Sequence, residues 1–403
     1  MGCVNTGVPD PPTRHGSIRH NQAAELQGWM VKQRRHLHRN PEVGLHLPDT
    51  HDYIESVLDG LGLDVERHDS AGITARIPGS APDGITTVLR TDMDALPVVE
   101  QTDLEFSSTR EGAMHACGHD LHMAMMLGAV RVLVNKPPRR DVVIAFQPGE
   151  ETDRGAIPTL DHQNLQLGTA ATAFAIHVHA TEPAHTVHYS HDVFMAFGDW
   201  FAIEFTGQGG HAAAPENAGN PIEASAKFVQ DLRVLVSQLS SDEHLVATVT
   251  ESSFGNSVNV IPAHGHLRGT LRTLSTERRA SLIDGMRALT HEAASTFGVS
   301  GNFQLTEGYP AVLNDRKFVE TMVDGLRAFV PPENLTEMPR PSMVIEDFAY
   351  FLQKWPGSMI YLGAQVAGRT SFNHSADAMY DEAVLTTGAT ILLTAADGFR
   401  SMS

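Results

Sequence analysis

Apolar residues recur along the chain with two different periods, and the order of those periods predicts the fold. Residues 23–35 and 47–63 carry apolar side chains at helical spacing, and so do residues 123–133. Four apolar runs have the length of strands: residues 73–77, 86–90, 141–146 and 171–178. Strands that alternate with helices predict an α/β fold with a mostly parallel sheet flanked by helices.

The pattern changes near residue 195 to strand, helix, strand, strand, helix, strand, which is the split βαβ layout. These elements are expected at residues 199–205, 221–239, 245–251, 265–273, 276–297 and 301–305. We therefore expect a smaller, ferredoxin-like α+β domain at 194–306, inserted into a main domain formed by 18–193 and 307–403. The main domain should end with elements at 317–329, 358–363 and 383–396. Residues 1–17 are expected to form a disordered leader.

Charge narrows the range of partners. The 403 residues include 29 Lys and Arg but 48 Asp and Glu, giving a net charge of −19. Such an acidic protein repels phosphate backbones, so nucleic acid is excluded as the main partner, and anionic membranes are disfavoured. No apolar run is long enough to span a bilayer, and no secretory signal is evident, so a cytoplasmic location is expected.

The two cysteines do not predict a structural disulfide. Cys3 lies in the leader and Cys117 in the main domain, which favours a reducing compartment. Residues 2–6 fit a loose myristoylation pattern, but no polybasic patch follows to supply a second anchor, so coincidence is the better interpretation.

The densest group of candidate ligands is the run from His115 to His122. Cys117 and His119 are separated only by Gly118, which permits a tight turn that aims a thiolate and an imidazole at one point. A helix follows directly, and its N-terminus favours the thiolate. A small buried cysteine beside capping groups is the structural alternative.

Two more groups lie where strands are expected to end, and a third candidate is a lone histidine. Glu150 and Glu151 follow one strand, and one carboxylate of such a pair can bind metal while the other serves as a general base. His177 and His179 share a face of the next strand by their spacing of two. His374 stands alone near the chain's end. Each group has a structural alternative, such as a solvated loop or a core histidine.

The order of these groups resembles a specific family. Seven short motifs occur in this order along the chain: LRTDMDALPV, GAMHACGHDLH, FQPGEE, GQGGHAAAP, NVIP, IEDFAYF and NHS. They resemble the amidohydrolase branch of the aminoacylase/carboxypeptidase metallopeptidases, which includes hippurate hydrolase, auxin-amino-acid conjugate hydrolases and N-acyl-amino-acid deacylases. The resemblance runs from about Arg35 to the C-terminus.

The resemblance implies two divalent transition-metal ions per chain, such as Zn, Mn, Co or Ni. Cys117 would bridge them, and the remaining ligands would be His119, Glu151, His177 and His374. Glu150 would be the general base. The other implied roles are Asp94 orienting a ligand, His211 contacting substrate on domain closure or across a dimer, and Asn259 and Arg272 on the substrate side. A structural ion pair is the alternative for Arg272.

Three departures from the family pattern fall around the expected pocket. They are Thr152-Asp153-Arg154 after the glutamate pair, His179 after the metal-binding histidine, and Ile345 before Glu-Asp. The ligands are all present, so the departures bear on the identity of the substrate.

The sequence therefore predicts a two-metal hydrolase that cleaves small N-acyl amino acids, or similar conjugates or peptides, and forms a homodimer or higher homo-oligomer. Two alternatives stay open. One is a hydrolase with Cys117 as the nucleophile, and the other is a non-catalytic amino-acid- or peptide-binding protein with the same fold.

Overall fold

The computed structural model describes residues 14–151, 154–168 and 170–399. These residues divide into two compact units. The smaller unit comprises Val193–Val312 and Arg340–Ala349, and the larger unit contains the other described residues. The segment Arg340–Ala349 thus groups with the smaller unit, whereas the sequence analysis assigned it to the main domain. The short strands β7 (Val193–Met195) and β14 (Val312–Leu313) lie where the chain passes between the units.

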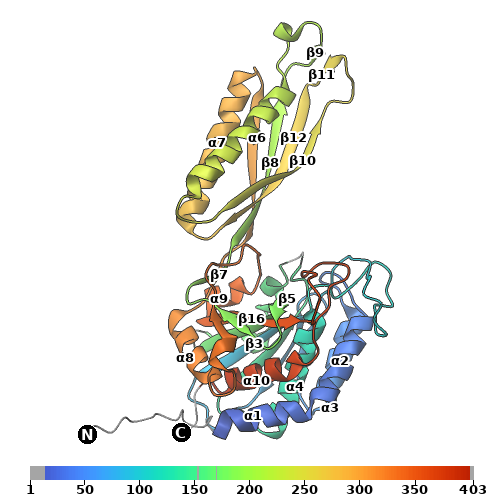
Figure 1. Cartoon of the computed structure of the whole chain (residues 1–403), viewed down its shortest axis with the longest axis vertical. Helices are drawn as coiled ribbons and strands as arrows, with labels where there is room; N and C mark the ends of the chain where they lie inside the picture. The colour runs from blue at the N-terminus through green and yellow to red at the C-terminus, as the bar shows by residue number, and fades with distance from the viewer. Residues whose placement is uncertain (1–13, 152–153, 169, 400–403) are drawn as a thin grey trace, which may run out of the picture. The chain divides into compact units, whose positions relative to one another are not determined.

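An eight-stranded mixed sheet forms the centre of the larger unit (Figure 1). In spatial order its strands are β1 (Val65–His68), β2 (Gly72–Ile77), β4 (Val142–Gln147), β3 (Thr86–Asp92), β5 (Ala171–Pro183), β16 (Gly357–Gln365), β6 (Val187–Tyr189) and β15 (Leu335–Glu337). The four central strands, β4, β3, β5 and β16, are parallel to one another. Every residue of β3 and β4 is buried, because the sheet is covered on both faces. β4 is a nearly continuous apolar run, whereas β3 also buries Arg90 and Asp92, which pair with each other at 2.7 Å.

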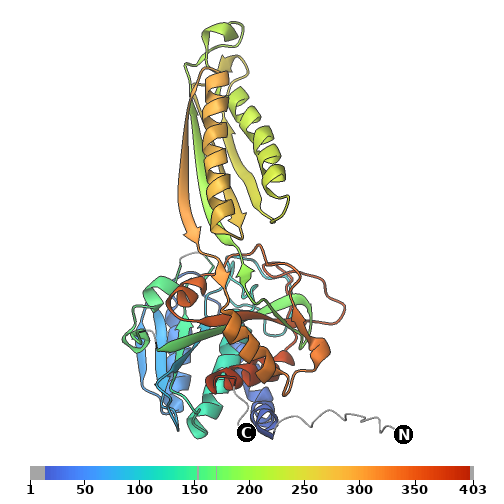
Figure 2. The ribbon, with the colours of Figure 1, turned by 90° about the vertical axis from the view of Figure 1, so that its left-hand side faces the viewer.

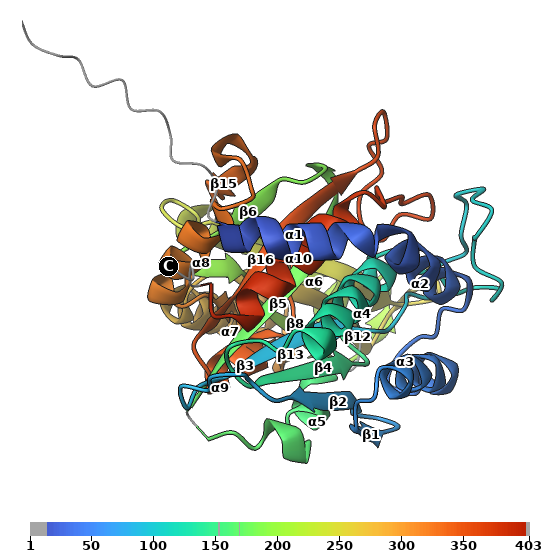
Figure 3. The same cartoon turned by 90° about the horizontal axis from the view of Figure 1, so that it is seen from below.

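Helices cover this sheet, as Figure 3 shows for α4 and α10, and α1 packs on α10. The helices of the larger unit are α1 (Arg14–Glu25), α2 (Gln27–Arg39), α3 (Pro48–Gly60), α4 (His119–Asn135), α5 (Ala156–Thr159), α8 (Arg316–Leu326), α9 (Ala349–Lys354) and α10 (Val384–Ala396). Helix α4 is buried on nearly every side because it packs against the sheet and also against α2 and α10. The predicted α/β architecture is confirmed.

The N-terminal helix begins earlier than the sequence predicts. Residues 14–17, which were assigned to the leader, belong to α1. This helix has a weak apolar pattern and depends on tertiary contacts, because the buried Arg19 guanidinium pairs with Asp397 at 3.0 Å. Cys3 and the myristoylation pattern lie outside the described residues. In the part of the chain that the structure describes, no helix is long and apolar enough to cross a membrane.

The smaller unit is a four-stranded antiparallel sheet with two helices on one face (Figure 2). Its sheet has the order β10 (Val246–Phe254), β12 (His264–Thr273), β8 (Phe197–Thr206) and β13 (Ser300–Tyr309). The helices α6 (Pro221–Leu239) and α7 (Thr276–Thr296) enclose an apolar core against it. Both begin at a capping side chain, since Asn220 and Ser275 accept hydrogen bonds from backbone N–H groups of the first turn. The predicted split βαβ order is therefore confirmed.

A separate two-stranded ribbon, β9 (Gly210–His211) with β11 (Val260–Ile261), extends beyond the strands of this unit.

Candidate active site

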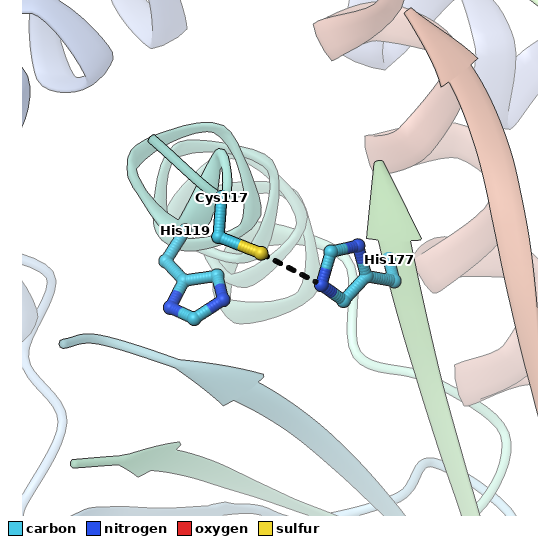
Figure 4. A group of neighbouring side chains, drawn as sticks. All are labelled: Cys117, His119 and His177. Carbon is cyan, nitrogen blue, oxygen red and sulfur yellow. Dashed lines mark hydrogen bonds between the residues drawn. The ribbon is translucent and has the colours of Figure 1, made fainter. Parts of the chain in front are cut away.

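Cys117 and His119 are placed by the turn that starts α4. Between them, Gly118 is the N-cap of the helix and has a φ of 86°, a conformation that side-chain-bearing residues rarely adopt. A Cβ atom at this position would lie 2.4 Å from Cγ2 of Val178. Both the backbone conformation and the available space therefore require glycine here. The turn directs the thiol of Cys117 at His177 on β5, and the ring of His119 lies on the other side of the thiol (Figure 4).

The other candidate ligands come from the carboxyl ends of parallel strands, which meet at one edge of an open sheet. Glu150 and Glu151 follow β4, His177 lies in β5, and His374 follows β16. The φ of His374 is 71°, and its backbone N–H donates to the carbonyl of Ala116 at 2.8 Å. A strained backbone that is held in this way is common at functional sites.

The structure brings the five predicted ligands together. Sγ of Cys117 lies 3.4 Å from Nε2 of His177 and 3.2 Å from Nε2 of His374. Nε2 of His374 lies 3.4 Å from Glu151, and Nε2 of His119 lies 3.8 Å from the other oxygen of that carboxylate. The atoms form two groups, each within 4.8 Å, namely Cys117 with His119 and His177, and Cys117 with Glu151 and His374. Cys117 is common to both groups.

The histidine tautomers suit metal binding. Nδ1 of His119 donates to the carbonyl of Asp94 at 2.8 Å, so its Nε2 carries the lone pair. Among the described residues, that buried Nε2 has no hydrogen-bond partner. Nδ1 of His177 likewise donates to the carbonyl of Val178 at 2.8 Å, which leaves Nε2 facing the thiol. Metal-binding histidines are characteristically oriented by such a hydrogen bond from the other nitrogen.

The electrostatics of the group also fit a cation. Burial lowers the pKa of His119 to about 3 and that of His177 well below its usual value, so both rings are neutral. Burial raises the pKa of the Cys117 thiol well above its usual value, and the carboxylates of Glu151 and Glu150 raise it further. A bound metal ion would counter this negative field and displace the thiol proton. The residues present therefore fit divalent metal ions.

Asp94 fixes the backbone of the glutamate pair. Its Oδ1 accepts the N–H of Glu150 and its Oδ2 accepts the N–H of Glu151, both at 3.0 Å. Burial raises the pKa of Asp94 to about 7, and these two hydrogen bonds oppose that rise. Asp94 thus fixes the backbone from which the side chains of Glu150 and Glu151 extend.

Two further residues of this site, Asp92 and His122, were given no role in the sequence analysis. Asp92 accepts hydrogen bonds from Arg90 at 2.7 Å and from Nδ1 of His122 at 2.6 Å. Nε2 of His122 accepts the N–H of Val178 at 2.8 Å, so both ring nitrogens are used within the protein. His122 is therefore a link between β3, α4 and β5. The sequence did hold a signal for these two residues. Asp92 lies two positions before Asp94 in one motif, and His122 lies three positions after His119 in the other.

Asn373 is a further residue that sequence reasoning missed. Its amide donates to the carbonyl of Val178 at 3.1 Å, and its Oδ1 accepts the N–H of Ala180 at 2.9 Å. The loop that carries His374 is thereby tied to β5. In the sequence, Asn373 directly precedes His374 in the motif NHS, and this adjacency was the signal for it.

The remaining predicted residues lie in the smaller unit. His211 is exposed on β9, where its Nδ1 accepts the N–H of Ala213 at 3.0 Å. The carbonyl of Asn259 accepts the N–H of Ala212, which places Asn259 beside His211. Arg272 lies near the end of β12 and pairs with Gly198 at the start of β8. The chain reaches His211 from the other end of β8, where Thr206 pairs with His264 at the start of β12. The structure thus groups Asn259 with His211 and puts Arg272 at the other end of that sheet.

The departures from the family pattern fall in different places. The ring of His179 makes edge contacts with Phe372 and Tyr361, with centroids 5.0 Å and 5.1 Å apart. Ile345 packs on Gly198 within the smaller unit, where a Cβ atom on the glycine would lie 2.4 Å from Cγ2 of Ile345. Thr152 and Asp153 lie outside the described residues.

Comparisons with known proteins identify the family of this chain. Residues 88–397 match the model of peptidase family M20/M25/M40. An N-acetyldiaminopimelate deacetylase of Anoxybacillus flavithermus is 34% identical over 83% of this chain and 89% of its own length. Thermostable carboxypeptidase 1 of Saccharolobus solfataricus is 32% identical over 92% of this chain and 95% of its own length.

Two solved structures share the whole fold. A putative aminohydrolase from methicillin-resistant Staphylococcus aureus has a TM-score of 0.88 and 29% identity, covering 96% of this chain and 100% of its own. The Bacillus subtilis YXEP protein, described as a dinuclear metal-binding peptidase, has a TM-score of 0.80 and 27% identity, covering 93% of this chain and 98% of its own. The chain therefore belongs to peptidase family M20/M25/M40 and is a metal-dependent hydrolase.

Proposed function

We propose that this hydrolase cleaves the amide bond of small N-acyl amino acids, and that it also accepts related conjugates or short peptides. The observation that carries the proposal is the glutamate pair that Asp94 holds beside the thiol–imidazole cluster. The names of the similar proteins, a deacetylase of an N-acetylated amino acid and a carboxypeptidase, both describe amide hydrolysis next to an amino acid.

In this proposal two divalent ions would be held by Cys117, which belongs to both ligand groups, and by His119, Glu151, His177 and His374. The ions, when bound, lower the pKa of water and polarise a carbonyl oxygen. Zn, Mn, Co and Ni all suit a set of imidazole, carboxylate and thiolate ligands.

Glu150 moves the proton. It is buried beside Glu151, and one oxygen of each carboxylate lies within 4.8 Å of a ring nitrogen of His119. Its carboxylate takes a proton from the attacking water and delivers it to the leaving nitrogen, as the C–O bond forms and the C–N bond breaks. The products are a carboxylic acid and a free amine, so atoms and charge balance.

His211 assists from the smaller unit. Because its Nδ1 accepts a hydrogen bond from Ala213, its proton lies on Nε2, and the exposed ring can donate to the substrate's carbonyl oxygen. We assign this contact to domain closure or to the second chain of a homodimer. Asn259, beside it, and Arg272 are proposed to contact the substrate.

The two rival hypotheses are disfavoured by specific observations. A nucleophilic cysteine needs a lowered thiol pKa, whereas burial and two carboxylates raise that of Cys117. A binding protein without activity has no need of Glu150 held beside the ligand cluster by Asp94. A cytoplasmic location, which would keep Cys117 reduced, remains a prediction.

The test is a substrate panel assayed with metal-stripped protein before and after reloading. The panel contains N-acetyl, N-benzoyl and long-chain N-acyl amino acids together with dipeptides. We expect hydrolysis of at least one N-acyl class, lost on chelation and restored by metal. Turnover that survives chelation and is blocked by alkylation of Cys117 would overturn the proposal in favour of the nucleophilic cysteine, and a loaded protein inactive on every class would favour the binding protein.

A further inference from the structure

We propose that Glu66, His68 and His162 form a second metal site, which binds a transition-metal ion such as Zn²⁺ and is built from different residues than the active site. We call these three residues the edge cluster, because Glu66 and His68 lie on β1, the edge strand of the large sheet. One ligand atom from each residue lies within 4.8 Å of the others.

His162 is the buried ligand of the edge cluster. Its side chain is 2% exposed, and its Nε2 donates to the carbonyl of Ala71 at 3.0 Å. The lone pair therefore lies on Nδ1, 3.6 Å from Glu66. The hydrogen-bond contact of Nδ1 within the described residues is a long one, 3.3 Å to the hydroxyl of Thr74. A neutral imidazole oriented by a carbonyl is the usual state of a metal-binding histidine.

Glu66 is held in place as an anionic ligand. Its Oε1 accepts the N–H of Gln163 at 2.8 Å and its Oε2 accepts the N–H of Asn164 at 3.0 Å. Burial raises the pKa of Glu66, but these backbone hydrogen bonds outweigh that effect and leave the pKa lowered. Each carboxylate oxygen keeps a second lone pair, so the glutamate can bind metal without releasing the turn.

His68 completes the cluster from the solvent side. It shares a face of β1 with Glu66 because the two are separated by two positions. Its Nε2 lies 3.4 Å from Glu66, and its ring meets that of His162 edge-on with centroids 4.6 Å apart. Being exposed, the ring can adjust to the ion without disturbing the core.

The chemistry of the set selects the ion. Two imidazoles and one carboxylate are a common protein ligand set for zinc, with a fourth position left for water. Hard ions such as Ca²⁺ and Mg²⁺ prefer all-oxygen ligands and would bind poorly. A surface ion pair between His68 and Glu66 would not require a buried imidazole with its lone pair turned toward the carboxylate. An ion here would tie the edge strand to the turn at residues 162–164.

The experiment compares zinc binding by the metal-stripped full chain and by two variants, His68→Ala and Glu66→Gln. His46→Ala is the matched control, since His46 is also an exposed histidine of the larger unit and lies outside the edge cluster. Titration calorimetry and elemental analysis should show that each edge variant binds one Zn²⁺ fewer than the wild type, while the control binds the same number.

Circular dichroism of the stripped variants checks that each is folded, and the surface position of His68 makes His68→Ala the safer of the two. Equal zinc stoichiometry and affinity in the wild type and in His68→Ala would overturn the proposal. The wild type, the edge variants and the control all have the same active site, so the result is the difference in bound zinc between them. If the active site failed to bind metal, the zinc count would fall equally in all of these proteins. That outcome is therefore distinguishable from a failure of the edge cluster.

Discussion

Oδ2 of Asp94 accepts the backbone N–H of Glu151 at 3.0 Å. A carboxylate that follows β3 thus positions a proposed metal ligand that follows β4. Its other oxygen holds Glu150 in the same way. One buried side chain thus sets the spacing between the proposed base and the proposed ligand. This arrangement makes Asp94 a positioning residue whose effect passes through both glutamates.

Asp94→Asn should weaken the site without unfolding the protein. An amide offers one acceptor where the carboxylate offers two, so one glutamate N–H loses its partner. Residues that orient metal ligands typically contribute about 10- to 100-fold in metal affinity or activity. We expect a loss of that size in metal affinity, measured by competition with a chelator.

Asp141→Asn is the control for this prediction. Asp141 also accepts a backbone N–H, that of Gly79 at 2.8 Å, but it precedes the amino end of β4. Its substitution should leave metal affinity unchanged. Equal metal affinity in Asp94→Asn and the wild type would show that the carboxylate does not position the pair.

Glu150 and Glu151 should separate into different roles when each is changed to glutamine. Glu150→Gln should retain both metals and lose at least about 100-fold in kcat, because glutamine cannot accept the proton. Glu151→Gln should lose metal, since an amide oxygen is a poorer ligand than a carboxylate. Elemental analysis and turnover measured on the same preparations check both. Normal turnover in a metal-replete Glu150→Gln protein would refute its assignment as the base.

His122→Ala should destabilise the protein. The change removes both hydrogen bonds of a buried ring and leaves the Asp92 carboxylate with one partner fewer. We expect the free energy of unfolding to fall by about 2 kcal/mol or more. Urea denaturation measures this, with the exposed His46→Ala as reference. If the two variants unfolded at the same urea concentration, the proposed link between β3, α4 and β5 would carry no stability.

His211→Ala should lower activity without affecting stability. The ring is exposed, and its hydrogen bond within the described residues is the one from Ala213, so little packing is lost. Loss of one donor to a developing oxyanion typically costs about 10²- to 10³-fold in kcat. Turnover, metal content and melting temperature from one preparation decide the matter. An unchanged kcat would contradict the assignment.

Much of this architecture follows from local patterns that the sequence displays. Residues 221–239 are predicted as a helix with the bounds that the structure gives, because Pro221 marks its start. The continuous apolar run at 141–146 predicts a fully buried strand, and β4 is one. Glu151 and His177 both lie at strand ends, and the rule that parallel strands end at one edge brings them together. His374 was assigned to the site by the family resemblance.

Other features depend on tertiary contacts that no local pattern encodes. Strands β6 and β15 are three residues long, too short to show a period, and form by pairing beside β16. Helix α1 has little apolar periodicity and is held by the pairing of Arg19 with Asp397, far away in sequence. Likewise, the use of both nitrogens of His122 depends on contacts with Asp92 and Val178 from two separate strands.

Cobalt substitution tests the central claim most directly, namely that Cys117 would be a ligand of the metal centre. The stripped protein is reloaded with Co²⁺ in a Cys3→Ser background, so that Cys117 is the one remaining cysteine of the sequence. We predict a thiolate-to-cobalt charge-transfer absorption that disappears in Cys117→Ser. The spectrum requires no knowledge of the substrate. A loaded protein without this band, whose thiol reacts equally with and without metal, would contradict the account.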